Sequence, residues 1–213
     1  MNIEFKTILP HPLRDIQHLP ESIWGASFTL VPGEKILLNA SSGKGKSTFT
    51  NITLGLRDDY DGTILFDGKD IRTLSLDEWV KIRQSGISVI FQDLQLFPDY
   101  SVKENLLLKS KLGSPFGVNE IKGFLTELGI GEKWDQKCGT LSLGQQQRVA
   151  IVRALLQPFE WLIMDEPFSH LDEENTQIAL QLINRITDIN KGGYVLTSLG
   201  EKFGFQFDRE LKL

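Results

Sequence analysis

The stretch ILLNASSGKGKSTFTNI, residues 36–52, joins a short apolar run to a loop of small residues and a segment of helical character. The loop ends in Gly45, Lys46, Ser47 and Thr48, which match the second half of the phosphate-binding pattern G-x-x-x-x-G-K-[ST]. Where that pattern begins with glycine, this chain has Ala40. A glycine turn with surface lysines would contain the same residues, so their context must distinguish the two interpretations.

The flanking residues favour a phosphate site. The apolar run KILL predicts a strand before the loop and STFTNITLGL predicts a helix after it, which is the context the pattern needs. Backbone N–H groups at the helix N-terminus would cradle phosphate oxygens, while Lys46 would reach the β and γ phosphates and the Ser47 hydroxyl would bind Mg²⁺. The methyl group of Ala40 is tolerable if that residue keeps a negative φ. The expected nucleotide-binding residues of the loop are Ser42, Gly43, Lys44, Gly45, Lys46, Ser47 and Thr48.

The composition is that of an ordinary globular protein of one large domain. The chain has 213 residues, of which 40% are hydrophobic and 24% charged. A net charge of −5 argues against a nucleic-acid binder. Cys138 is the only cysteine, which excludes an intrachain disulfide and favours a reducing compartment. The first residues do not read as a secretory signal, and no apolar run is long enough to span a bilayer, so we expect any membrane role to come through a partner.

Alternating strands and helices predict an α/β fold with a mostly parallel sheet. The early strands have no helices between them, which predicts an antiparallel layer near the N-terminus. Residues 94–139 carry helical signals and little strand signal, which predicts an inserted helical lobe. Helices are expected after Lys46, Val102, Asn119, Gln145 and Asp172. The expected strands are Ile3–Ile8, Trp24–Val31, Lys35–Leu38, Gly62–Phe66, Ser88–Phe91, Trp161–Met164, Tyr194–Thr197 and Phe205–Leu213.

Four further segments follow the loop in the order and spacing of a known family. TLSLGQQQRVAIVRALL (140–156) resembles the signature motif of ABC-type ATPases, and WLIMDEP (161–167) resembles their Walker B strand. SHLD (169–172) is similar to their D-loop and VIFQDLQLFP (89–98) to their Q-loop. The resemblance covers essentially the whole chain. It implies a single P-loop NTPase domain over residues 1–213, with its core at about 1–93 and 140–213 and a helical subdomain at about 94–139.

The Walker B and Q-loop segments supply the expected catalytic groups. Asp165 and Glu166 follow a buried strand and should emerge beside the phosphate loop. Asp165 would hold Mg²⁺, and Glu166 would act as general base on the attacking water. Gln92, at the end of another strand, could touch both Mg²⁺ and that water. An acidic helix cap and a surface glutamine are the structural alternatives.

The signature segment carries a second type of expected contact. Ser142 precedes a helix whose apolar residues share one face, so it is a good N-cap. The same geometry presents Ser142, Gly144 and Gln145 to an anion. In the family this anion is the γ-phosphate of ATP held by the opposite subunit, so the resemblance implies a dimer around two ATP molecules, a homodimer in the simplest case.

Three positions besides Ala40 depart from the family pattern. Leu143 stands where glycine is common, and its side chain must point away from a shared nucleotide. In the segment YVLTSLGE, Ser198 stands where the family has a switch histidine that contacts the γ-phosphate. We expect Ser198 to be a third catalytic residue, after Glu166 and Gln92. Because serine is shorter than histidine and cannot be cationic, the substitution predicts slow ATP turnover. No aromatic residue lies near the end of the first strand to contact adenine, and His11 is a weak candidate.

Two functions remain open at this point. The first is an ATP-hydrolysing subunit, cytoplasmic and peripheral on the inner face of the cell membrane, that powers a separate transmembrane permease. The second is a nucleotide-gated clamp or regulatory subunit that hardly turns over. The motif wording is closest to ATPases of lipoprotein release and macrolide export. Family branches with long coiled coils, two ATPase units or zinc-binding cysteines do not fit this length and composition.

Overall fold

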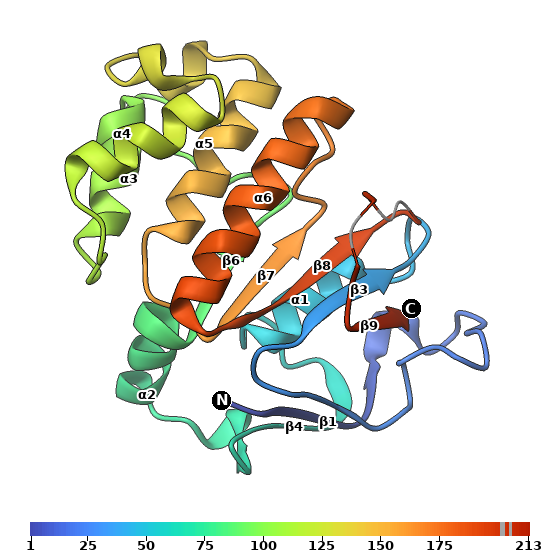
Figure 1. Ribbon diagram of the computed structural model, residues 1–213. Coiled ribbons are helices and arrows are strands. Elements are labelled where there is room, and N and C mark those ends of the chain that lie inside the picture. Colours follow the sequence, from blue (N-terminus) through green and yellow to red (C-terminus); the bar gives the residue numbers. More distant parts are fainter. Residues whose placement is uncertain (201–202, 205) are drawn as a thin grey trace.

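The computed structural model describes residues 1–200, 203–204 and 206–213, and its centre is a five-stranded parallel sheet (Figure 1). The strand order is β6-β7-β8-β3-β9. Parallel pairing brings the carboxyl ends of β3 and β7 to one edge of the sheet, where the phosphate loop and the acidic pair follow. These strands are β3 (Lys35–Asn39), β6 (Ile87–Ile90), β7 (Trp161–Asp165), β8 (Gly193–Ser198) and β9 (Arg209–Lys212).

The parallel sheet is buried on both faces, which explains why its strands are apolar without alternation. On β7, Trp161 and Ile163 belong to one core cluster while Leu162 and Met164 belong to the other. One cluster packs the sheet against α5 (Leu143–Leu155) and α6 (Glu173–Asn190). The other packs it against α1 (Lys46–Thr53) and the second sheet.

The predicted antiparallel layer is confirmed. It is a four-stranded sheet of order β2-β1-β4-β5, with β1 (Ile3–Pro10), β2 (Phe28–Leu30), β4 (Tyr60–Phe66) and β5 (Lys69–Asp70). The pairing of β1 with β4 shifts register between Lys6 and Leu9, where Thr7 has a φ of 48°. Gly62 faces this bulge, and a Cβ there would lie 2.3 Å from the Lys6 carbonyl oxygen, so only glycine fits.

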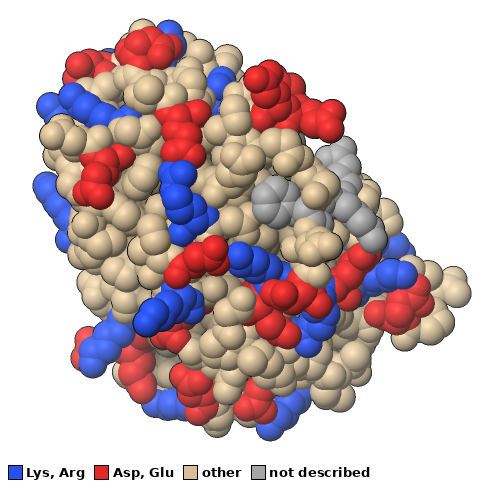
Figure 2. All heavy atoms as spheres, in the orientation of Figure 1, with Lys and Arg blue, Asp and Glu red and all other residues tan. Residues whose placement is uncertain are grey.

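The helices α3 (Val102–Ser110) and α4 (Val118–Glu127) lie on the far side of α5 from α6 (Figure 1). Ser101 caps α3 through a reciprocal capping box with Glu104, which explains where this helix begins. Among the residues that the structure describes, no helix is long and apolar enough to cross a membrane. Basic and acidic side chains are interspersed on the face that Figure 2 shows.

Several expected boundaries were wrong. The expected strand Trp24–Val31 is reduced to Phe28–Leu30, because Trp24 lies in a turn whose ring packs under the phosphate loop. The expected strand Phe205–Leu213 is reduced to Arg209–Lys212, and Phe205 lies outside the described residues. The helices expected after Asn119 and Gln145 begin slightly earlier, at Val118 and Leu143. The short helix α2 (Leu76–Lys81) and strand β5 were not expected.

Candidate functional site

The phosphate loop joins β3 to α1, as expected. Gly43 and Gly45 have φ values of 78° and 104°, a left-handed conformation that aims successive N–H groups to one side. A Cβ on Gly45 would lie 2.6 Å from Leu13 and 3.0 Å from Trp24. The glycine is therefore required by close packing as well as by φ. The loop borders a pocket of about 250 Å³ lined by Leu13, Ser42, Gly43, Gly45, Lys46, Ser47, Thr48, Gln92 and Glu166.

Ala40 meets the condition for replacing glycine at the strand exit. It is buried and its φ is not positive. Its N–H donates to the carbonyl of Ser198 at 3.1 Å, which ties the start of the loop to β8. Its own carbonyl accepts from Lys46 Nζ at 3.0 Å. The methyl group of Ala40 is therefore accommodated in the hydrophobic core beneath the loop.

Hydrogen bonds of Trp24 and Lys44 stabilise the phosphate loop. The Trp24 indole Nε1–H donates to the Lys44 carbonyl at 3.0 Å. Lys44 Nζ donates to the Gln17 carbonyl at 3.2 Å, so this side chain is bonded away from the pocket that Lys46 enters. The contribution of Trp24 was missed by sequence reasoning, because its partner lies 20 residues further along the chain.

Lys46 and Glu166 meet at the mouth of the pocket. Lys46 Nζ lies 3.2 Å from Glu166 Oε1 and also donates to the Ser41 carbonyl at 3.4 Å. Glu166 has a φ of 49°, and its N–H donates to Thr197 Oγ1 at 3.0 Å. This left-handed conformation directs the carboxylate from the end of β7 back towards the loop.

Asp165 lies deeper than Glu166 and is almost fully buried. Burial raises the pKa of Asp165, and hydrogen bonds from Ser47 and Thr197 oppose this shift. Thr197 Oγ1 donates to Asp165 Oδ1 at 3.0 Å. Ser47 and Asp165 line a second hollow of about 560 Å³ together with Gln92 and Asn51. Gln92 thus borders both hollows, and Asn51 joins the set without having been expected.

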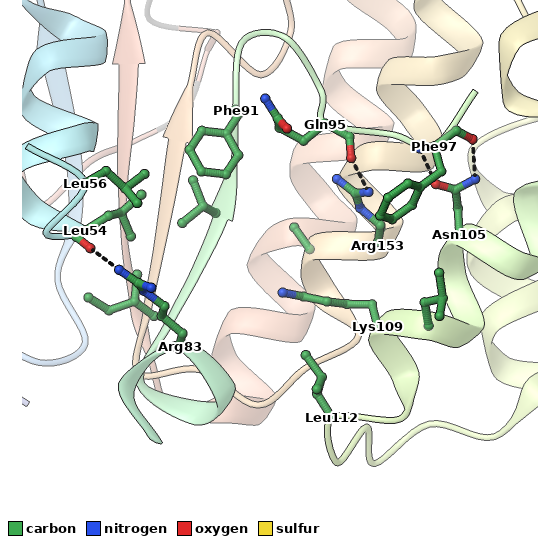
Figure 3. Close-up of a pocket in the computed structure, with 14 residues that line it drawn as sticks. Leu54, Leu56, Arg83, Phe91, Gln95, Phe97, Asn105, Lys109, Leu112 and Arg153 are labelled. Carbon is green, nitrogen blue, oxygen red and sulfur yellow. Dashed lines mark hydrogen bonds between the residues drawn. The ribbon is translucent and has the colours of Figure 1, made fainter. Parts of the chain in front are cut away.

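The segment after Gln92 has an unusual backbone. Leu94 and Gln95 have φ values of 62° and 49°, which is costly for residues with side chains. Their carbonyls accept from the Arg153 guanidinium at 2.7 and 2.6 Å. Arg153 lies on α5, which begins in the signature motif and is called the signature helix below. Its hydrogen bonds hold the segment from Gln92 to Gln95, the Gln92 loop, in this conformation (Figure 3).

Ser198 ends β8 and is almost fully buried. It borders a separate cavity of about 240 Å³, shared with Glu166 and Ser169, instead of the phosphate-loop pocket. Ser198 Oγ accepts from the Gly200 N–H at 3.3 Å. His11, the candidate for adenine, lies 3.5 Å from Asp61 on the exposed surface and does not line the phosphate-loop pocket.

The signature residues form a helix cap, as expected for Ser142. Ser142 Oγ accepts from the Gln145 N–H at 3.3 Å, and Gln145 Oε1 accepts from the Ser142 N–H at 3.0 Å. Leu143 is 56% exposed and points into solvent. A Cβ on Gly144 would lie 2.7 Å from the His170 carbonyl oxygen. None of Ser142, Gly144 and Gln145 lines the phosphate-loop pocket of the same chain.

Gln147 joins the signature helix to the acidic strand end, a link that was not expected. It is fully buried and donates through Nε2 to the Glu166 carbonyl and to Ser169 Oγ, both at 3.3 Å. Its Oε1 accepts from the His170 N–H at 2.8 Å. Movement of α5 therefore acts directly on the backbone of Glu166.

Comparison with known proteins agrees with this geometry. A family model described as ABC transporter matches residues 23–169. The lipoprotein-releasing system ATP-binding protein LolD of Coxiella burnetii is 31% identical over 87% of this chain and 82% of its own length. The macrolide export ATP-binding/permease protein MacB of Marinobacter nauticus is 30% identical over 88% of this chain, which spans only 31% of that protein. The dimeric structure of the bacterial ABC transporter cassette MJ0796 superposes with a TM-score of 0.81 at 25% identity, over 99% of this chain and 94% of that one.

Proposed function

The chain belongs to the ABC transporter family, and we propose that it binds and hydrolyses ATP to power a separate transmembrane permease. The observation that carries this proposal is the meeting of Lys46 and Glu166 at 3.2 Å in a pocket lined by glycine-rich backbone. No packing requirement of the fold brings a buried lysine and two acids to one sheet edge. Phosphoryl transfer requires all three.

Triphosphate binding would rearrange the charge pair. Lys46 Nζ donates to two carbonyls and faces Glu166, so its position is set before phosphate arrives. A triphosphate carries more negative charge than one carboxylate and forms charge-assisted hydrogen bonds with lysine, so it competes with Glu166 for Lys46. When phosphate takes over Lys46, Glu166 is released to orient and deprotonate the attacking water.

The residues present suit a magnesium ion. Mg²⁺ prefers a few protein oxygens together with phosphate oxygens and water. Ser47, Gln92 and Asp165 offer hydroxyl, amide and carboxylate oxygens around one hollow. The bound ion would neutralise developing phosphate charge. It would also keep Asp165 ionised in spite of its burial.

Dimerisation would complete the site. Ser142, Gly144 and Gln145 present a capped helix N-terminus away from the phosphate pocket of their own chain. A second copy, head to tail, would place this N-terminus on the γ-phosphate. The dimeric state of the similar cassette MJ0796 supports this arrangement.

The relatives support a proposal for the membrane component and for the location of the chain. LolD is named as part of a lipoprotein-releasing system and MacB as a macrolide export protein. We place this chain on the inner face of the cell membrane, held there by a permease of the export type. Its contact with the permease would lie beside the Gln92 loop, which borders a large apolar groove.

Ser198 favours slow turnover and keeps the clamp as a second candidate function. A serine is shorter than histidine and cannot be cationic. Ser198 also borders a cavity next to the phosphate pocket instead of the pocket itself. Because that cavity reaches Glu166, an imidazole at this position has room to approach the site. Ser198→His should raise the hydrolysis rate about tenfold or more; an unchanged rate would show that the serine is not the limiting defect.

The decisive experiment is Mg-ATP hydrolysis by the purified chain as a function of protein concentration. We expect the rate per chain to rise with concentration, and Glu166→Gln to lower it by about 10²–10⁴-fold while ATP binding is retained. ATP should also convert the Glu166→Gln variant to a dimer in size-exclusion chromatography. ATP-dependent dimerisation without hydrolysis by the unaltered chain would select the clamp. Absence of ATP binding would refute both functions.

A further inference from the structure

His170 is an exposed histidine in the segment that follows the acidic pair. Its backbone is fixed from two sides. The N–H donates to Gln147 Oε1 at 2.8 Å, and the carbonyl oxygen lies so close to Gly144 that a Cβ there would be 2.7 Å away. Gln147 and Gly144 both belong to the signature helix. His170 is therefore held beside the N-terminus of that helix, on the face that would cover the γ-phosphate of a partner subunit.

The imidazole of His170 does not enter the site of its own chain. Its neighbours Ser169 and Leu171 line the cavity of about 240 Å³ beside Glu166. The histidine between them lines neither that cavity nor the phosphate-loop pocket. A side chain that is exposed and faces away from the catalytic base of its own chain is available to a second molecule.

A chain of hydrogen bonds orients the ring of His170. Gln147 Nε2 donates to Ser169 Oγ at 3.3 Å, and Ser169 Oγ lies 3.0 Å from His170 Nδ1. Since the serine oxygen already accepts from Gln147, its own hydrogen can be donated to Nδ1. The proton of a neutral imidazole then lies on Nε2, which has no hydrogen-bond partner within the described part of the chain. The Nε2–H group is thus a donor that another molecule can use.

The cavity beside Glu166 offers a space of suitable size for such a donor. Ser198 lines it, at the position where the family resemblance places a histidine. Two other residues that line the cavity are open to solvent, since Ser169 is exposed and Leu199 is 60% exposed. The space next to the catalytic base can therefore be reached from the surface of the chain.

We propose that His170 of each subunit donates to the γ-phosphate in the site of its partner subunit, through the space that the partner's Ser198 leaves beside the partner's Glu166. This inference rests on the proposed function, in which two copies close head to tail around ATP. Because a two-fold axis relates the copies, each gives one imidazole and receives one. The imidazole supplies, from the other chain, the donor that the switch position lacks.

No proton passes through His170 in this step. The attacking water gives a proton to the partner's Glu166, its oxygen forms a bond to Pγ, and the bond from Pγ to the departing ADP breaks. The Nε2–H group of His170 keeps its proton and stabilises the negative charge on the γ-phosphate oxygens while these bonds change.

The first test measures proximity across the dimer by thiol crosslinking. One chain carries His170→Cys and the other Leu199→Cys, both with Glu166→Gln so that bound ATP holds the dimer closed. The native Cys138 is buried, so a short bis-maleimide reacts with the introduced thiols. Ile189→Cys replaces Leu199→Cys in the matched control, because Ile189 is 57% exposed but lies at the opposite end of α6 from His170. We expect an ATP-dependent crosslink at least about tenfold above this control, since α6 is about 27 Å long.

The second test is a double-mutant cycle in Mg-ATP hydrolysis. His170→Ala should lower the rate at least about tenfold in the chain with Ser198, because a transition-state donor is lost. In the Ser198→His background the same change should cost less than about twofold, since a histidine at position 198 already supplies that donor. His170→Gln keeps an N–H donor and should restore part of the lost rate.

The two tests separate this inference from the proposed function. Thermal unfolding checks that His170→Ala is folded, and His170→Phe, which keeps a ring without a donor, replaces it if it is not. Equal losses in the two backgrounds, or a crosslink no stronger than that of the Ile189→Cys control, would overturn the role of His170 and leave the proposed function intact. If the unaltered chain does not hydrolyse ATP, the proposed ATPase fails, and the crosslink alone decides whether His170 reaches the partner's site.

Discussion

Lys46 and Lys109 each reach into a hollow of the same molecule, and their surroundings differ in one respect. Lys46 faces Glu166 at 3.2 Å and donates to the carbonyls of Ala40 and Ser41. Lys109 lies in the groove beside the Gln92 loop, with Arg153 as a second cation next to it (Figure 3). The charge of Lys46 is therefore balanced within the chain before substrate binds, whereas the described residues that line the groove offer Lys109 no acidic side chain. The charged form of Lys46 is favoured by its neighbour, whereas burial and the charge of Arg153 disfavour the charged form of Lys109.

The largest expected effect comes from removing the balanced lysine. Lys46→Met deletes a charged donor to phosphate and leaves Glu166 without its ion pair. A hydrogen bond to a charged group contributes about 1.5–3 kcal/mol, so ATP should bind about 10- to 150-fold more weakly. Isothermal titration calorimetry with ATP measures this change.

Lys44→Met is the matched control for that experiment. Lys44 lies in the same loop and would contribute only its backbone N–H to phosphate, because its Nζ donates to the Gln17 carbonyl and the residue does not line the pocket. We expect ATP affinity to change less than about threefold, as for an ordinary surface substitution. Equal losses in the two variants would mean that loop charge alone, and not the position of Lys46, holds the phosphates.

A smaller effect is expected at the link between the signature helix and Glu166. Gln147→Met keeps the volume but leaves the Glu166 carbonyl and the His170 N–H without their buried partner. An unsatisfied buried group costs about 1–3 kcal/mol, which corresponds to roughly 2–4 °C in Tm per kcal/mol for a chain of this size. Hydrolysis should fall while ATP affinity is retained, because Gln147 does not line the phosphate pocket.

Calorimetric unfolding and a filter-binding assay with ATP measure the two effects of Gln147→Met separately. Gln181→Met, on the exposed side of α6, is the control and should leave both unchanged. Loss of ATP affinity with an unaltered Tm would contradict the assignment of Gln147 as a positioning residue.

Sequence reasoning placed residues correctly in the fold where a feature depends on neighbouring residues. The glycine-rich loop before α1, the acidic pair at the end of β7 and the Ser142 cap all depend on residues within a few positions of one another. It missed Trp24, Gln147 and Arg153, whose partners lie 20, 19 and up to 59 residues away. A tryptophan in a β-rich window favours a strand by its local propensity, and only the packed loop shows that it lies in a turn instead.

The smallest expected effect is a pH dependence specific to Lys109. Its pKa is about 8 in the folded chain and near 10.5 when unfolded, so between these values the unfolded chain binds more protons. Stability rises with pH under that condition, because deprotonation removes the cost of a partly buried charge. The free energy of unfolding of the unaltered chain, minus that of Lys109→Met, should therefore increase from pH 8 to pH 10 in urea titrations. A flat difference across this range would mean that water or an acid already solvates Lys109, and the contrast with Lys46 would disappear.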